Sequence, residues 1–140
     1  MSRVFWDTAL FIYLIEDAGP LGQQTRELAA RMQERGDELY ASTMTLGEVL
    51  AGPARRGNPQ LAETYEQLFA RHLALIPFDQ QAARLYAQVR IDTAIHPPDA
   101  IQLACAARAG VDLFVTNDKD LAKRDVPGIK FITKLDRVPI

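Results

Sequence analysis

The chain has 140 residues, of which 48% are hydrophobic, so it is long enough to build the core of one globular domain. Its formal net charge of −2 argues against a simple basic protein that binds nucleic acid by charge alone. No hydrophobic run is long enough to cross a membrane, the N-terminus reaches Asp7 too early for a signal peptide, and the single cysteine, Cys105, suits a reducing cytoplasm.

The first half of the chain alternates short hydrophobic runs with helical periodicity. In chain order it predicts a strand, two helices, a second strand and a third helix, at Arg3 to Trp6, Thr8 to Glu16, Leu21 to Arg35, Glu38 to Ser42 and Thr43 to Ala51. Gly36 ends the second helix, Thr43 caps the third, and Gly52-Pro53 stops it.

The second half repeats this alternation after a loop at Arg55 to Pro59. The predicted elements are a helix, a strand, two helices, a strand, a short helix and a strand, at Gln60 to His72, Leu73 to Phe78, Asp79 to Thr93, Asp99 to Arg108, Asp112 to Thr116, Lys119 to Arg124 and Ile129 to Ile132. Strands separated by helices imply parallel crossovers. We therefore predict a three-layer α/β/α sandwich with a mainly parallel central sheet, formed by one domain over residues 1–140.

Two acidic residues follow predicted strands directly. Asp7 comes after Val4 to Trp6, and Asp118 comes after the strand that ends at Thr116. Both therefore lie at the carboxyl ends of strands, where open parallel sheets place their ligand crevice. Asp120 is close enough to share the role of Asp118. Either aspartate is equally suited to cap the helix that follows it.

Two further acids lie on mostly uncharged helices. Glu48 is surrounded by the run Met44 to Ala51, and Asp99 opens a helix that is hydrophobic on nearly all sides. A solvated glutamate and a favourable first-turn aspartate are the plain alternatives. However, the two strand-end acids and the two helix acids can converge in only one place, a crevice above the sheet.

Converging carboxylates repel one another and raise one another's pKa values unless a cation compensates them. A ligand set made only of oxygen suits Mg²⁺ or Mn²⁺. Zinc is disfavoured because His72 and His96 have no suitable spacing to each other or to Cys105.

Four segments in order carry a resemblance to a known family. They are Val4-Phe5-Trp6-Asp7-Thr8, Ser42-Thr43-Met44-Thr45-Leu46-Gly47-Glu48-Val49, Pro98-Asp99-Ala100-Ile101-Gln102-Leu103-Ala104 and Val115-Thr116-Asn117-Asp118-Lys119-Asp120-Leu121. With them, the whole chain resembles the PIN-domain family and, within it, the VapC toxins of bacterial toxin–antitoxin pairs.

The resemblance implies a metal-dependent endoribonuclease that hydrolyses RNA phosphodiesters with Mg²⁺ or Mn²⁺. It carries over Asp7, Glu48, Asp99 and Asp118 as the catalytic metal site, with Asp120 as a candidate fifth ligand. It also implies a toxin role, a homodimer and a cognate antitoxin whose tail occupies the acidic groove. Thr116 resembles the family's hydroxyl near the fourth acid. Cations that are candidates to bind flanking phosphates are Arg55, Arg56, Lys119, Lys123 and Arg124.

Two alternatives remain open at the level of sequence. One is a non-catalytic PIN-like module that binds RNA or protein without turnover. The other is an acidic-pocket phosphoryl-transfer protein, which is disfavoured because Ala9 occupies the place where a phosphatase of the haloacid-dehalogenase type has its second aspartate. Asp79, which follows a middle strand, has the position of a helix cap and not that of a phospho-acceptor.

Overall fold

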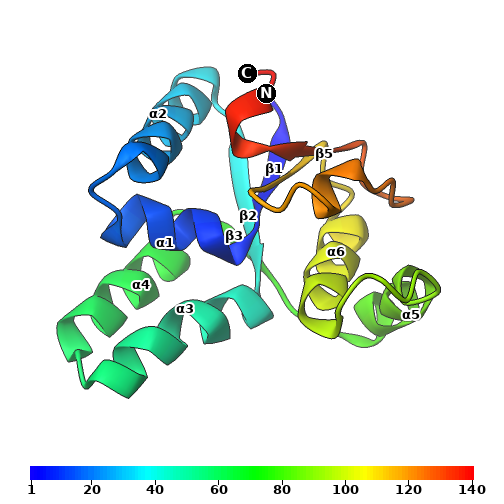
Figure 1. The fold of residues 1–140 in the computed structure, drawn as a ribbon, viewed down its shortest axis with the longest axis horizontal. Helices are drawn as coiled ribbons and strands as arrows, with labels where there is room; N and C mark the ends of the chain where they lie inside the picture. The colour runs from blue at the N-terminus through cyan, green and yellow to red at the C-terminus, as the bar shows by residue number, and fades with distance from the viewer.

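The computed structural model describes residues 1–140, and its five strands lie in one sheet between two layers of helices (Figure 1). In chain order the elements are β1 (Arg3–Trp6), α1 (Thr8–Glu16), α2 (Pro20–Arg35), β2 (Glu38–Ser42), α3 (Thr43–Arg56), α4 (Pro59–Arg71), β3 (Ala74–Ile76), α5 (Gln80–Val89), α6 (Pro97–Ala109), β4 (Leu113–Thr116), the short 3-10 helix η1 (Leu121–Lys123), β5 (Phe131–Lys134) and the 3-10 helix η2 (Leu135–Arg137). None of the helices is both long and apolar enough to span a bilayer.

The sheet has the strand order β3-β2-β1-β4-β5, and all four strand pairs are parallel. The central strand β1 is in register with both neighbours, since Val4 pairs with Leu39 on β2 and with Leu113 on β4. Parallel pairing places the carboxyl ends of all five strands along one edge of the sheet. The predicted three-layer sandwich with a parallel sheet is therefore confirmed.

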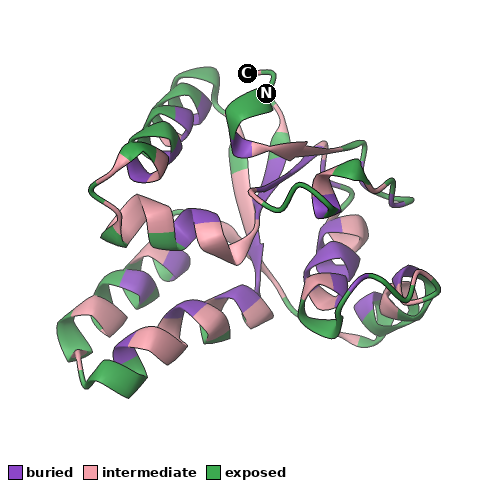
Figure 2. Ribbon diagram, viewed as in Figure 1, coloured by how far each residue is buried: buried purple, intermediate pink, exposed green.

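Each face of the sheet carries its own hydrophobic core (Figure 2). Val4 and Trp6 of β1 point toward α1 to α4, whereas Phe5 points toward α5 and α6. This division follows from the alternation of side chains along a strand. Val4, Phe5 and Trp6 are fully buried, and the residue that follows them, Asp7, lies at the carboxyl edge of the sheet.

The prediction that Gly52-Pro53 stops the third helix is wrong, and so is the loop at Arg55 to Pro59. Helix α3 continues to Arg56, and Gly57, in the left-handed conformation at φ 61°, ends it. Proline removes only one intrahelical hydrogen bond, and the buried Pro53 packs in the core side of the helix. The N-cap is Ser42, not Thr43, because its side chain accepts from the backbone N–H of Thr45 at 3.1 Å.

Other boundaries differ by a few residues. Strand β3 is shorter than predicted and ends before Pro77, which has no N–H to donate to a ladder. Strand β5 begins at Phe131, because the predicted start, Ile129, is buried in a turn in which its N–H bonds to Val126 at 3.1 Å. Helix α5 ends at Val89 rather than Thr93, and the predicted helix Lys119 to Arg124 shortens to η1.

Candidate active site at the carboxyl edge of the sheet

Four acids from four different elements meet at the carboxyl edge. Asp7 follows β1, Glu48 lies in the second turn of α3, Asp99 opens α6 and Asp118 follows β4. Burial, opposed by hydrogen bonds from Thr116 and Thr8 and assisted by the charges of Asp99 and Glu48, raises the pKa of Asp7 to about 6. The pKa of Asp99 is likewise raised by burial and by the charges of Asp118 and Glu48. These charge effects are those of carboxylates that lie near one another along the carboxyl edge of the sheet.

The protein supplies no cationic side chain to neutralise these acids. Six ion pairs occur in the molecule, and their acids are Glu16, Asp37, Asp79, Asp92 and Asp112. None of the four converging acids, nor Asp120, has a Lys, Arg or His nitrogen within the 4.0 Å of an ion pair. His96 lowers the pKa of Asp99 only through its charge. The crevice therefore carries an uncompensated negative charge.

Hydrogen bonds connect the acids of the two central strands. Asp7 accepts from the backbone N–H of Thr8 at 2.8 Å and from the hydroxyl of Thr116 at 2.7 Å. The same Thr116 oxygen accepts from the backbone N–H of Asp118 at 3.1 Å. Asp7 thus caps α1 and faces the crevice at once, so the capping and functional interpretations are compatible. The predicted role of Thr116 beside the fourth acid has a structural counterpart in this contact.

Asp118 and Asp120 differ in their relation to the site. Asp118 Oδ1 accepts from the backbone N–H groups of Asp120 at 2.9 Å and Leu121 at 3.2 Å, so Asp118 orders the turn before η1. It is Asp118, not Asp120, whose charge raises the pKa of Asp99. Both side chains are exposed. The geometry therefore favours Asp118 as the fourth acid of the crevice.

A buried glutamine holds Glu48, and the sequence analysis missed it. Gln102 is 2% exposed, and its Nε2 donates to Glu48 Oε1 at 2.8 Å and to the hydroxyl of Thr8 at 2.6 Å. The Thr8 hydroxyl in turn donates to Glu48 Oε1 at 2.6 Å. The amide oxygen of Gln102 accepts from the buried Thr45 hydroxyl at 2.9 Å, which fixes the orientation of the amide. The available signal was that Gln102 is the single polar residue between Ala100 and Ala107, one turn after Asp99.

The donor chemistry fits a hard divalent cation. The crevice offers carboxylate oxygens only, and several of them accept no hydrogen bond from the protein: Glu48 Oε2, Asp118 Oδ2 and both oxygens of Asp99. As the side chains stand, no group of three or more acidic, His or Cys side chains is close enough to enclose an ion. Asp7, Glu48 and Asp99 are partly buried and Asp118 is exposed, so the four carboxylates face a crevice that is open to solvent.

The predicted phosphate-binding cations divide into two groups. Arg56 pairs with Glu16 at 3.0 Å, and Arg124 pairs with Asp92 at 2.7 Å, so both are engaged within the protein. Arg55, Lys119 and Lys123 are exposed and take part in no ion pair. Arg55 lines a hollow of about 370 Å³ between α1 and α3 that also contains Glu48.

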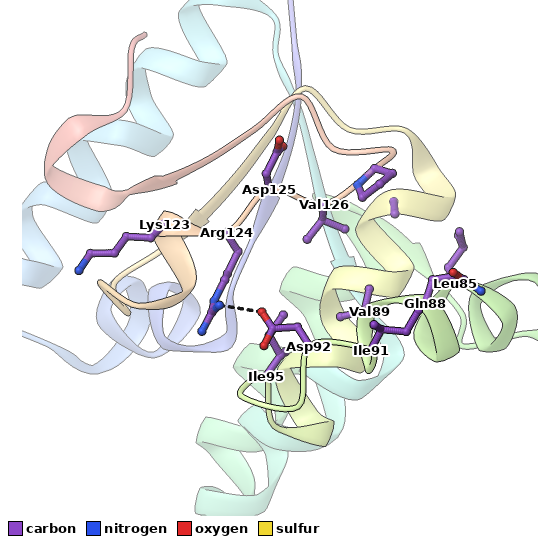
Figure 3. Close-up of a pocket in the computed structure, with 12 residues that line it drawn as sticks. Leu85, Gln88, Val89, Ile91, Asp92, Ile95, Lys123, Arg124, Asp125 and Val126 are labelled. Atoms are coloured by element: carbon purple, nitrogen blue, oxygen red, sulfur yellow. Dashed lines mark hydrogen bonds and ion pairs between the residues drawn. The ribbon is translucent and has the colours of Figure 1, made fainter.

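The largest cavity lies elsewhere and contains none of the site acids. It has about 630 Å³ and is bounded by α5, the loop before α6 and residues 123–127 (Figure 3). Its lining is mainly apolar, with Val89, Ile95 and Val126 among its residues, and the Asp92–Arg124 pair closes one side. The four converging acids therefore lie outside this cavity. Asp79 is a structural residue, as expected. Its carboxylate caps α5 by accepting from the backbone N–H of Ala82 at 2.9 Å, and it pairs with Arg108.

Comparison with known proteins agrees with this architecture. The family model described as PIN domain matches residues 4–127. Curated protein sequences gave no match. Among solved structures, DNA-bound VapBC from Salmonella typhimurium superposes with a TM-score of 0.75 at 24% identity, over 96% of this chain and 99% of that one.

Two further structures have the same fold. VapBC2 from Rickettsia felis, bound to a DNA fragment from its promoter, gives a TM-score of 0.75 at 15% identity, over 94% of this chain and 98% of that one. Mycobacterium tuberculosis VapC20, a toxin that cleaves the sarcin–ricin loop, gives 0.65 at 18% identity, over 84% of this chain and 91% of that one. At these identities the likeness establishes the fold.

Proposed function

The chain belongs to the PIN domain family, and from this premise we propose that it is a Mg²⁺- or Mn²⁺-dependent endoribonuclease and the toxin of a toxin–antitoxin pair. One observation carries the proposal. Asp7, Glu48, Asp99 and Asp118 converge from four elements, raise the pKa values of Asp7 and Asp99, and have no cationic partner in the protein. Such an arrangement is costly unless a bound cation offsets it.

The four acids would hold the cation by their carboxylate oxygens. When bound, a divalent cation lowers the pKa of a coordinated water and stabilises negative charge on the phosphate and leaving oxygens. The chain's own contribution is orientation. Gln102 and Thr8 hold Oε1 of Glu48, so that Oε2 is free for the crevice, while Thr116 holds Oδ2 of Asp7. Residues around a metal site of this kind restrict the rotamers of the ligands.

Asp99 is the carboxylate best placed to accept the proton of the attacking water. Neither of its oxygens takes part in a hydrogen bond within the protein, and burial together with the charges of Asp118 and Glu48 raises its pKa above the usual value. A general base works best when its pKa approaches the pH of the reaction. In-line attack would leave a 5′-phosphate and a 3′-hydroxyl.

The same proposal includes a protein partner. The solved structures of the same fold include complexes named as VapBC and a toxin–antitoxin complex from Klebsiella pneumoniae. In this chain Ile12 is 38% exposed and lines the hollow that contains Glu48 and Arg55. An antitoxin segment with apolar side chains, and a basic side chain directed at Glu48 and the other site acids, would fit that hollow and cover the crevice. A homodimer is the expected assembly.

The test is a cleavage assay with purified protein freed of any antitoxin. Labelled tRNAs, a sarcin–ricin loop oligonucleotide and matched DNA strands are incubated with Mg²⁺, Mn²⁺ or EDTA. We expect RNA cleavage that needs metal and that falls at least 100-fold in Asp7→Asn and Asp99→Asn, as is usual when a group that acts in the transition state is lost.

Asp112→Asn is the matched control, because Asp112 pairs with Lys130 at 3.0 Å near the amino end of the sheet. It should cleave as the wild type does. Activity that survives in both site variants would assign cleavage to a contaminant. If both cleavage and metal binding are absent, the protein is a non-catalytic binding module and not an enzyme.

A further inference from the structure

Cationic side chains gather beside β5, the edge strand that neighbours β4 and Asp118. A hollow of about 440 Å³ lies between η1, the carboxyl end of β5 and η2. Its lining contains four cationic side chains, Lys119, Lys123, Lys134 and Arg137, and a single acid, Asp136. The hollow is distinct from the acidic crevice, yet Lys119 follows Asp118 directly in the chain.

The four cations are free to bind a ligand. None of them takes part in any of the six ion pairs of the molecule, although five other Lys and Arg side chains do. The neighbouring Arg124 is different, because it points to Asp92 and pairs with it at 2.7 Å (Figure 3). Figure 3 shows the Lys123 side chain extending away from the Asp92–Arg124 pair, although Lys123 also lines the rim of the apolar cavity. Four cations beside a single acid, Asp136, repel one another in the free protein and favour an anionic ligand.

The fold fixes these cations relative to the acids. In the β4–β5 ladder Lys134 is the partner of Thr116, whose hydroxyl binds Asp7. Adjacent strands lie about 4.8 Å apart, so the backbone at Lys134 is one strand away from the crevice. The hydroxyl of Thr133 donates to the carbonyl of Arg137 at 3.2 Å, which ties η2 to the end of β5. Lys134 and Arg137 are therefore held on the same side of the site as Asp118.

We propose that Lys119, Lys123, Lys134 and Arg137 form a phosphate-binding hollow for the RNA strand beside the scissile phosphodiester. The inference rests on the proposed function and adds to it the direction in which the substrate leaves the crevice. An acidic crevice in a chain of net charge −2 repels RNA, so cations must hold the strand on at least one side of the cut. Non-bridging oxygens of backbone phosphates carry no sequence information, and this hollow would therefore contribute affinity and register but no base preference.

The experiment measures RNA binding without metal, so that binding is independent of cleavage. Fluorescence anisotropy of a single-stranded oligoribonucleotide is recorded in EDTA over a range of salt concentrations. The test variant is Lys134→Gln with Arg137→Gln. The matched control is Arg84→Gln with Lys130→Gln, which removes the same two kinds of cation from α5 and from the amino end of β5.

Each phosphate contact contributes about 0.7 to the slope of log affinity against log salt for single strands. Loss of two contacts should therefore reduce the slope by about 1.4 and the affinity about 10- to 30-fold at 0.1 M salt. The control pair should leave both quantities as in the wild type. A charge-preserving pair, Lys134→Arg with Arg137→Lys, should bind within about 3-fold of the wild type, which separates lost charge from lost folding.

Three outcomes would overturn the proposal. The first is equal affinity and slope in the test and control variants, and the second is no RNA binding by the wild type in EDTA. The third is that the test variant loses affinity for an acidic peptide such as poly-glutamate but keeps its affinity for RNA, which would assign the hollow to a protein partner. Metal-dependent cleavage is recorded in parallel. If cleavage is absent while binding depends on the hollow, the nuclease proposal fails and the RNA-binding hollow stands.

Discussion

Among single residues, Asp7 bears the largest electrostatic cost of the site. Its pKa of about 6 in the folded protein compares with 3.8 for an ordinary aspartate, mainly because it is buried. At pH below about 4 the carboxyl is protonated in both the folded and the unfolded chain, and the burial has no electrostatic cost. Above pH 6 it is ionised in both, so folding stability falls as the pH rises from about 4 to 6.

The change Asp7→Asn should therefore stabilise the metal-free protein at pH 7. A rise in pKa from 3.8 to about 6 corresponds to about 3 kcal/mol at most, and we expect a gain of about 1–3 kcal/mol in the free energy of unfolding. The gain should vanish near pH 4. Urea denaturation at pH 4 and pH 7 in EDTA measures both values.

Asp112→Asn provides a control of opposite sign. The pKa of Asp112 is lowered by the backbone N–H of Arg3 and by Lys130, so its ionised form stabilises the fold above the usual pKa and this contribution is lost as the pH falls. The variant should be less stable than the wild type at pH 7. An Asp7→Asn protein that is also less stable at pH 7 would contradict the burial described for Asp7.

A second prediction distinguishes the roles of Asp118 and Asp120 in metal-dependent cleavage. Asp118 acts on Asp99 and orders the turn before η1, whereas Asp120 contributes only its backbone N–H to that turn. Asp118→Asn should lower metal-dependent cleavage at least 10-fold more than Asp120→Asn. Initial rates at saturating Mn²⁺ measure the difference. Equal losses would place Asp120 in the ligand set, and a larger loss in Asp120→Asn would exchange the two roles.

A third prediction concerns Gln102 as a positioning residue. Gln102→Met keeps the length of the side chain but leaves Glu48, Thr8 and Thr45 without their buried partner. We expect a loss of about 1–3 kcal/mol in stability and a 10- to 100-fold loss in Mn²⁺ affinity. Mn²⁺ titration of the folded variant separates the two effects, because a purely structural glutamine would leave the affinity unchanged. Gln81→Met, on the exposed face of α5, is the control.

The acids of the site were visible in the sequence for a physical reason. A carboxylate directly after a buried strand, as at Asp7, or on an apolar helix, as at Asp99, departs from the hydrophobic pattern that a core requires. Gln102 was not singled out, because a neutral amide interrupts that pattern less than a charge does. Its partners are 54 and 94 residues away in the chain, and only the fold brings them together.

Among the elements, α1 and α2 meet at a close backbone approach around Gly22. A Cβ on Gly22 would lie 1.9 Å from the carbonyl oxygen of Asp17 and 2.9 Å from that of Tyr13. The backbone N–H of Gly22 also donates to the Asp17 carboxylate at 2.7 Å. Only glycine permits this contact, which sets the angle at which α2 leaves the end of α1.

Two glycine-to-alanine changes test this account of the elements. Gly22→Ala should destabilise the protein by about 2–4 kcal/mol, because two helices must separate to admit the methyl group. Gly47→Ala should stabilise it by about 0.5–1 kcal/mol, because Gly47 is inside α3 with no atom within 4 Å of its Cβ position. Thermal unfolding of both variants gives the comparison. Equal effects of the two changes would contradict the packing of α1 on α2.

Hydrophobic periodicity and capping residues predicted which segments are helices and which are strands. They did not predict several of the residues at which these elements begin or end. The helix after Ser42 was expected to stop at Gly52-Pro53, yet burial of Pro53 carries α3 on to Arg56. Likewise, the hydrophobic Ile129 marks a buried turn and not the start of β5. In both cases tertiary packing determines the boundary, and a local pattern contains no information about that packing.

In the whole molecule, the small net charge conceals a separation of charge. Acids without cationic partners gather at the carboxyl ends of β1 and β4, while cations without acidic partners gather beside β5. Both groups depend on the parallel sheet, which brings residues more than 100 positions apart to one edge, as in the contact of Asp7 with Thr116. The composition alone could not reveal this arrangement, since it averages the two groups.

The most direct test of the central claim is a calorimetric titration of the metal-free protein with Mn²⁺. If Asp7, Glu48, Asp99 and Asp118 form one divalent-cation site, the wild type binds Mn²⁺ and each single amide variant, Asp7→Asn, Glu48→Gln, Asp99→Asn or Asp118→Asn, binds it at least 10-fold more weakly. Asp112→Asn should bind as the wild type does. Equal Mn²⁺ affinity in the wild type and all four site variants would contradict the claim, because the cation would then be held elsewhere.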